Sequence, residues 1–66
     1  MDIKKSIEHF MYELRINQNQ LANNSGIDVS SLSLIRRGLR SPNLDSLNKI
    51  AGACNVKLSE FIAAGE

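Results

Sequence analysis

The sequence predicts an all-α domain of five short helices around one small core. Apolar residues recur at steps of three and four along most of the chain, which is the spacing of one helix face. Glycine, proline and asparagine fall between these stretches, where helices begin and end. No stretch alternates apolar and polar residues as a strand does, so the sequence indicates no sheet.

The first helix is expected at about residues 3–15 and the second at 18–25. Asp2 is placed to cap the first helix, whose apolar stripe is formed by Ile3, Ile7, Phe10 and Leu14. The second helix, which Asn17 is expected to cap, is rich in asparagine and glutamine. Asparagine is a poor helix former, so packing through Leu21 and Ala22 must hold this helix in place.

The third helix is expected at residues 29–37, after a turn at Gly26 and a cap at Asp28. Its buried face is predicted to carry Leu32 and Ile35, with Ile27 also buried just before it. The opposite face carries small hydroxyls, one arginine and one exposed leucine, namely Ser30, Ser33, Arg37 and Leu34. Gly38 ends the helix. Two helices that cross at such a turn form a helix-turn-helix pattern.

The fourth helix is expected at residues 44–54, after Pro42 and a cap at Asn43, and the last at 58–63. The apolar stripe of the fourth helix is formed by Leu44, Leu47, Ile50, Ala51 and Cys54. That of the last helix is formed by Leu58, Phe61 and Ile62, and Gly65 is expected to end the ordered chain. We interpret residues 1–66 as a single domain.

Composition narrows the classes of function. The 66 residues are 42% hydrophobic, which is enough for one small core. There is no apolar run of the ~18 residues that a membrane span needs, and the N-terminus lacks the apolar region of a signal peptide. Cys54 is the one cysteine, so no internal disulfide forms and we expect the cytoplasm. The net charge of +1 is weak for a nucleic-acid binder, but three arginines fall within five residues at 36–40.

A set of residues in a fixed order and spacing carries a family resemblance over about residues 3–62. The set is Asn17, Gln18, Leu21, Ala22, Gly26, Ile27, Ser31, Leu32, Ile35 and Gly38, followed by Arg40, Pro42, Leu44, Leu47, Ile50, Ala51, Val56, Leu58 and Phe61. In this pattern the chain resembles the Cro and phage-repressor class of helix-turn-helix regulators, also called the xenobiotic-response-element-like family.

The resemblance implies a compact, lambda-repressor-like DNA-binding domain whose third helix enters the major groove. It implies a sequence-specific transcriptional regulator, a repressor in our interpretation, that binds double-stranded DNA as a homodimer on a pseudo-palindromic site. Matched residue by residue, the expected base contacts are Val29, Ser30, Ser33 and Leu34. The expected phosphate contacts are Asn17, Gln18, Arg36, Arg37, Arg40 and Ser41.

The chain departs from the family pattern at three places. Ser25 stands where a larger apolar residue is usual, which we expect to loosen the core slightly. Arg36 replaces an acid that in many members pairs with a basic residue at the position of Met11, so we expect no such ion pair and a free Arg36 facing a phosphate or Glu13. The reading face has no arginine, asparagine or glutamine at its centre, which predicts T-rich sites and moderate selectivity.

One alternative function stays open: a protein-interaction module of the same fold, such as an antitoxin, an antirepressor or a regulatory partner. In that case Leu34 contacts a protein rather than a base, and Ile62 is a candidate for a dimer contact in either case. An enzyme is not expected, since the serines near residue 30 have no activating base and Cys54 lies in an apolar stripe. No metal, cofactor or small-molecule site is indicated, because His9 stands alone and no glycine-rich phosphate loop is present.

Overall fold

A computed structural model describes residues 2–66, which form five helices and, over those residues, no strand. The helices are α1 (Ile3–Leu14), α2 (Gln18–Ser25), α3 (Val29–Arg36), α4 (Leu44–Ala53) and α5 (Leu58–Ala63). The all-helical fold class and the helix-turn-helix formed by α2 and α3 are therefore as predicted.

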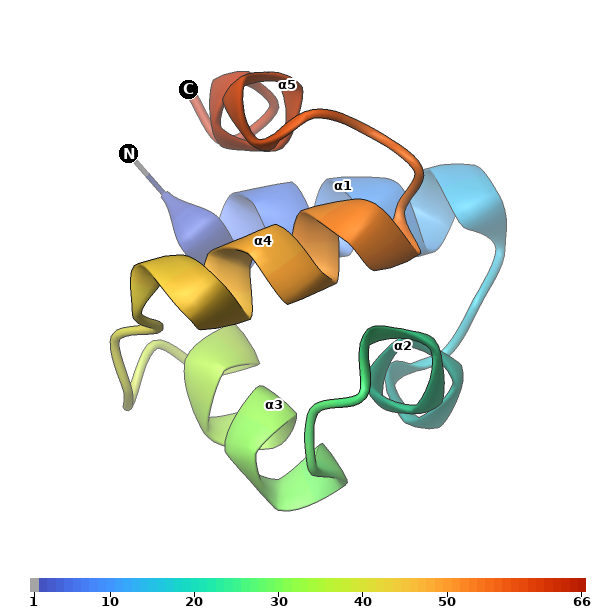
Figure 1. The fold of residues 1–66 in the computed structure, drawn as a ribbon, viewed down its shortest axis with the longest axis vertical. Helices are drawn as coiled ribbons and strands as arrows, with labels where there is room; N and C mark the ends of the chain where they lie inside the picture. The colour runs from blue at the N-terminus through green and yellow to red at the C-terminus, as the bar shows by residue number, and fades with distance from the viewer. Residues whose placement is uncertain (1) are drawn as a thin grey trace.

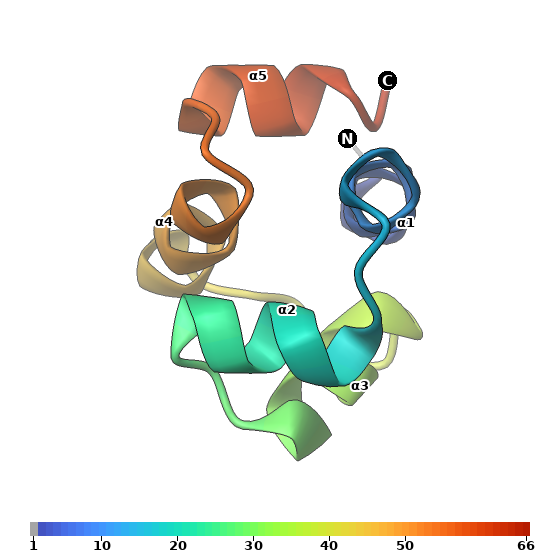
Figure 2. The same cartoon turned by 90° about the vertical axis from the view of Figure 1, so that its right-hand side faces the viewer.

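The helices surround one core, with the helix-turn-helix on one side of the molecule and α5 on the other. In Figure 1, α1 and α4 cross the middle, α5 lies above them, and α2 and α3 lie below. The view turned by 90° keeps the same order, so α5 and α3 lie on opposite sides of the molecule (Figure 2). The face of α3 that is turned away from the core is consequently not covered by α5.

The core takes residues from all five helices. Its fully or nearly fully buried members are Ile7, Leu21, Ala22, Leu32, Ile35, Leu47, Ile50, Ala51, Cys54 and Phe61. Burial of the expected contacts of α2 and α3 is confirmed for Leu21, Ala22, Leu32 and Ile35, whereas Ile27 is only partly buried against this cluster. Burial of apolar surface of this kind is the main favourable contribution to folding of so short a chain.

Two leucines that were predicted as core residues are exposed. Leu14 is 41% exposed and Leu44 is 64% exposed, because each lies at an end of its helix, beyond the neighbouring helices that cover the middle of the stripe. On α1 the buried face instead runs through Ser6 and Ile7, with Met11 partly buried beside Phe10. The prediction that Leu14 belongs to the buried stripe of α1 is therefore wrong.

The ends of three helices differ from the predicted ends by one residue. Arg15, Arg37 and Cys54 were expected as the last helical residues, but each is a C-cap that follows its helix. A cap residue is only half inside the helix, so the pattern of apolar and charged residues locates the end of a helix only to within about one residue. Arg15 also has a left-handed backbone, with φ of 54°, which turns the chain toward α2.

The last helix closes the core and brings the chain back to its start. Phe61 is fully buried and its ring lies 5.7 Å from that of Phe10 in a stacked arrangement. Gly65 is itself buried, and a Cβ at this position would collide with the backbone oxygen of Asp2 and the hydroxyl of Ser6. Gly65 was expected only to end the ordered chain, and its close approach to α1 is an addition that the sequence did not suggest.

Candidate nucleic-acid interface

The turn between α2 and α3 is fixed by a glycine and a buried serine. Gly26 has φ of 75°, a value that glycine adopts without steric cost, and its N–H donates to the oxygen of Ala22 at 3.0 Å. The hydroxyl of Ser25 donates to that same oxygen at 3.2 Å and accepts from the N–H of Ile27 at 3.4 Å. Ser25, which we had expected to loosen the core, thus bonds both sides of the turn.

The starts of both helices are capped as predicted. Asn17 and Gln20 form a reciprocal capping box, in which each side-chain oxygen accepts from the backbone N–H of the other residue at 2.8 Å. Asp28 Oδ2 accepts from the N–H groups of Ser30 and Ser31 at 3.1 and 3.3 Å. These bonds set the direction in which α3 leaves the turn, and with it the direction of its outer face.

The end of α3 is fixed just as closely. Gly38 has φ of 76°, and its N–H donates to the backbone oxygen of Ile35. The N–H of Leu39 donates to the backbone oxygen of Leu34 at 2.9 Å. This is the Schellman pattern, with the glycine at the position predicted for it. Beyond it, Nη1 of Arg40 donates to the hydroxyl of Ser31 at 3.3 Å, which ties the following loop back to α3.

The four residues predicted to contact bases gather in one shallow depression on the outer face of α3. We call it the reading depression; it is lined by Gln18, Val29, Ser30, Ser33, Leu34 and Arg37. Two predicted phosphate contacts, Gln18 and Arg37, therefore lie beside the predicted base contacts. Val29 is 40% exposed, whereas Leu34 is half-buried rather than exposed as predicted.

Arg36 lies at the crossing of α2 and α3. Its Nη1 donates to Oε1 of Gln18 at 3.2 Å, in a partly buried hydrogen bond between residues 18 apart in sequence. Arg36 was expected to be free to face a phosphate or Glu13; the structure gives it Gln18 as partner instead of Glu13, and the phosphate contact stays a prediction. Arg36 and Gln18 line a second depression next to the first, which we call the arginine depression, together with Lys4, Glu8 and Arg37.

The remaining predicted phosphate contacts lie away from these two depressions. Arg40 and Ser41 are exposed and line a separate cleft on the other side of α3, where the loop passes Ser46 and Lys49 of α4. Asn17 lines neither depression, and its side chain is used in the capping box. The structure thus brings Gln18, Arg36 and Arg37 together and leaves Arg40 and Ser41 as a second cationic edge.

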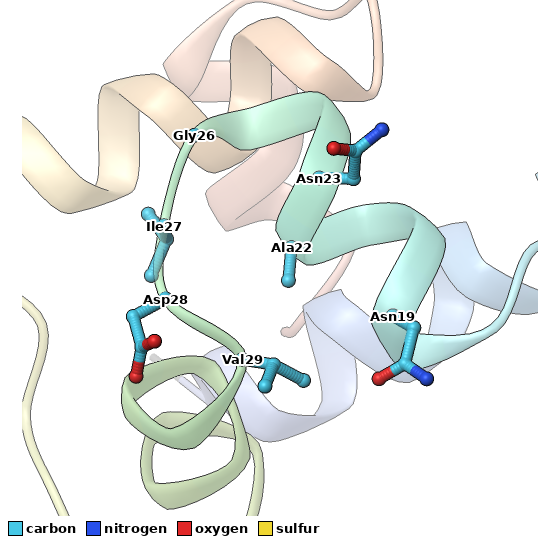
Figure 3. Close-up of a pocket in the computed structure, with 7 residues that line it drawn as sticks. All are labelled: Asn19, Ala22, Asn23, Gly26, Ile27, Asp28 and Val29. Atoms are coloured by element: carbon cyan, nitrogen blue, oxygen red, sulfur yellow. The ribbon is translucent and has the colours of Figure 1, made fainter.

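A further hollow lies between α2 and the start of α3 (Figure 3). It is lined by Asn19, Ala22, Asn23, Gly26, Ile27, Asp28 and Val29. Ala22 has only a methyl group to place between the helices, and Asn19 and Asn23 place their amides at the rim (Figure 3). Sequence reasoning did not single out these two amides, although their spacing of four residues puts them on one face of α2.

Lys4 is the other lining residue that sequence reasoning missed. The sequence predicts no role for Lys4, yet the fold places it in the arginine depression with Arg36 and Arg37. No local signal could have shown this, because the depression combines α1, the start of α2 and the end of α3. Its position depends on how these three helices cross.

Other groups of chemical interest are accounted for by packing. Among residues 2–66 no three histidine, cysteine or acidic side chains lie close enough together to hold a metal ion. Cys54 is buried beneath α4, and this burial raises the pKa of its thiol. His9 lies edge-on to the ring of Phe10, with centroids 5.0 Å apart. None of the helices in this part of the chain is long and apolar enough to cross a membrane.

Comparison with known proteins identifies the same region. A family model described as helix-turn-helix matches residues 11–61, a span that begins at the end of α1 and contains α2, α3, α4 and the first part of α5. The match therefore covers the turn, both capped helix starts and the reading depression. No curated protein matches the chain.

Proposed function

The chain belongs to the Cro/C1-type helix-turn-helix family of DNA-binding transcriptional regulators, and we propose that it is a repressor whose α3 enters the major groove of an operator. The observation that carries this proposal is the reading depression. Four residues at the family's base-contacting positions share it with Gln18 and Arg37, to which this proposal assigns the flanking phosphates. A major groove about 12 Å wide accepts a helix that presents such a face.

The phosphate contacts of this proposal come from two sides of α3. Gln18 and Arg37 lie on the side of α1, next to Arg36, which bonds to Gln18. Arg40 and Ser41 lie on the side of α4. Asn17 contributes at the start of α2, where the first backbone N–H groups have no acceptor within the helix and suit a phosphate oxygen. Such contacts hold the domain on the duplex without reading its sequence.

The base contacts of this proposal are apolar or small. Val29 and Leu34 suit the methyl groups of thymine, whereas the hydroxyls of Ser30 and Ser33 bond to any base edge. We therefore propose operators with T-rich positions, and selectivity that depends in part on DNA shape. A homodimer on a pseudo-palindrome, with half-sites about one helical turn apart, would double the number of base contacts that one domain provides.

A salt titration with matched variants tests the proposal. Binding of the domain to duplex DNA is measured at several salt concentrations for the native chain, for Arg37→Ala and for Lys57→Ala. Arg37 lines the reading depression, whereas Lys57 carries a like charge at the start of α5, on the opposite side of the molecule. We expect Arg37→Ala to weaken binding to every sequence and to reduce the salt slope by about 1, and Lys57→Ala to change neither.

The outcome also separates this function from the interaction module. Binding that is absent at low salt, or equal losses in both variants, would contradict contact through the α3 face and favour a protein partner on Leu34. Selection of bound sequences from a random pool then tests the dimer. An inverted repeat with T-rich positions supports it, whereas a strongly G-rich motif contradicts the assigned base contacts.

A further inference from the structure

The side chain of Gln18 is held at one end by Arg36. Gln18 is the first residue of α2, and it lines both the reading depression and the arginine depression. Its Oε1 accepts the 3.2 Å hydrogen bond from Nη1 of Arg36, the last residue of α3. This partly buried bond joins the start of one helix of the pair to the end of the other.

The chemistry of the two groups fixes the direction of the amide. A guanidinium carries five N–H donors and no acceptor, whereas a primary amide has an acceptor oxygen on one side and a two-donor nitrogen on the other. Only the amide oxygen can therefore face Arg36, and the Nε2 group is turned away from it. A glutamine without such a partner could present either side to a ligand.

The outward side of this amide borders the surface assigned to DNA. Gln18 shares the reading depression with Val29, Ser30, Ser33, Leu34 and Arg37. A bidentate contact to adenine uses the amide oxygen as well as the nitrogen. The bond to Arg36 fixes the direction of that oxygen and occupies one of its two lone pairs, so this contact is disfavoured, and a partner that only accepts hydrogen bonds suits Gln18 best.

We propose that Arg36 is a positioning residue, which turns Gln18 into a donor toward DNA and restricts its partner to an acceptor. The acceptor is either a phosphate oxygen or a base edge such as N7 and O6 of guanine. This inference rests on the proposed DNA-binding function of the α3 face. It differs from a direct phosphate contact by Arg36, because here the effect of Arg36 passes through the amide of Gln18.

A double-mutant cycle separates the two roles. Duplex binding is measured for the native chain, Arg36→Met, Gln18→Ala and the double variant, and thermal unfolding checks that all four are folded. Methionine keeps an unbranched apolar stem but has no N–H donor. We expect Arg36→Met to weaken binding about tenfold in the native background, as for loss of a hydrogen bond to a charged group. When residue 18 is alanine, we expect a clearly smaller effect, due only to the loss of one positive charge.

Arg40→Met is the matched control, since Arg40 bonds to Ser31 and not to Gln18. Its effect is expected to be the same with and without Gln18. If Arg36→Met weakens binding equally in both backgrounds, Arg36 contacts DNA by itself and the proposal is overturned. A native chain that binds no DNA at low salt overturns the proposed function as well, which is a different result from an additive cycle in a chain that binds.

Selection of bound sequences identifies the acceptor. If Gln18 donates to a base, the native chain selects guanine at one position, and the Arg36→Met variant selects adenine as well as guanine at that position. If Gln18 donates to a phosphate, Arg36→Met weakens binding to all sequences alike and leaves the selected motif unchanged. Adenine selected at that position by the native chain, with no change in Arg36→Met, overturns the proposal.

Discussion

The two sides of this molecule are held by different kinds of interaction. On the side of α2 and α3, side chains bond to nearby backbone groups at Asn17, Ser25 and Asp28. On the side of α1 and α5, the fully buried ring of Phe61 packs on Phe10, and α5 has no side-chain cap at its start. Local polar bonds thus fix both helices of the helix-turn-helix, whereas burial holds α5 in place.

This difference explains how a chain of 66 residues keeps one helix face open. Caps and turn bonds fix a helix without covering its outer surface, so α3 can carry small and half-exposed side chains toward a ligand. α5 has no side-chain cap at its start and depends on apolar area removed from water. Substitutions on the two sides should therefore separate the effects on binding from the effects on stability.

The largest effect is expected for Phe61→Ala. Phe61 is 0% exposed, and truncation of a buried phenylalanine costs about 3–5 kcal/mol, which is a large part of the stability of a small domain. Urea denaturation measures the loss. Leu44→Ala, at a side chain that is 64% exposed, is the control and should change stability by no more than about 0.5 kcal/mol. A small loss for Phe61→Ala would mean that α5 contributes little to the core.

The next effect is expected for Gly65→Ala. The added methyl would collide with the backbone oxygen of Asp2 and the hydroxyl of Ser6, so the end of α5 has to move, at a cost of about 1–3 kcal/mol. Gly52→Ala is the matched control, because nothing lies within 4 Å of a Cβ at this position in α4. It should stabilise the chain by about 0.5–1 kcal/mol. Thermal unfolding of both variants checks that Gly65→Ala lowers stability and Gly52→Ala raises it.

A smaller effect, on both stability and DNA binding, is expected for Asn17→Ala. Asn17 and Asn43 both cap a helix through the side-chain oxygen, at 2.8 Å in each case, so removal of either should cost about 1 kcal/mol of stability. Only Asn17 starts the helix that carries Gln18, so only Asn17→Ala should also weaken DNA binding at a temperature where both variants are folded. If the two variants bind DNA with equal affinity, Asn17 is not part of the DNA interface.

The smallest effect is the dependence of stability on alkaline pH. Burial raises the pKa of Cys54 above its ordinary value of 9.0, so the folded chain holds the thiol proton more tightly than the unfolded chain. The resulting contribution to stability is complete below the unfolded pKa and is lost as pH rises through the folded pKa. Urea denaturation between pH 7 and about 10 should show this loss in the native chain, and Cys54→Ala should show less of it.

Much of the fold could be predicted because its signals are local. Asn17, Gly26, Asp28 and Gly38 were assigned as caps and turn residues from their neighbours alone, and all four take those roles. The apolar spacing likewise placed each helix. Its error at Leu14 has a physical reason: a stripe marks one face of a helix but does not show where the covering helices end.

The site was less predictable because its contacts join distant parts of the chain. Spacing on α3 was sufficient to put Ser30, Ser33 and Leu34 on one face. The bond of Arg36 to Gln18 and the presence of Lys4 beside them depend on how three helices cross. Charge favoured the carboxylate of Glu13 as a partner of Arg36, whereas the fold places the neutral amide oxygen of Gln18 at 3.2 Å from it.

The contact of Gly65 with Asp2 makes the backbone nearly a closed ring. A short linker across these ends, with new ends opened at exposed Asn55, would make α5 and α1 neighbours in sequence and should leave the core intact. The C-terminal end lies on the side of α5, opposite α3 (Figure 2). A second domain fused at this end would thus emerge on the side remote from the reading depression, which makes this small domain suited to modular assembly.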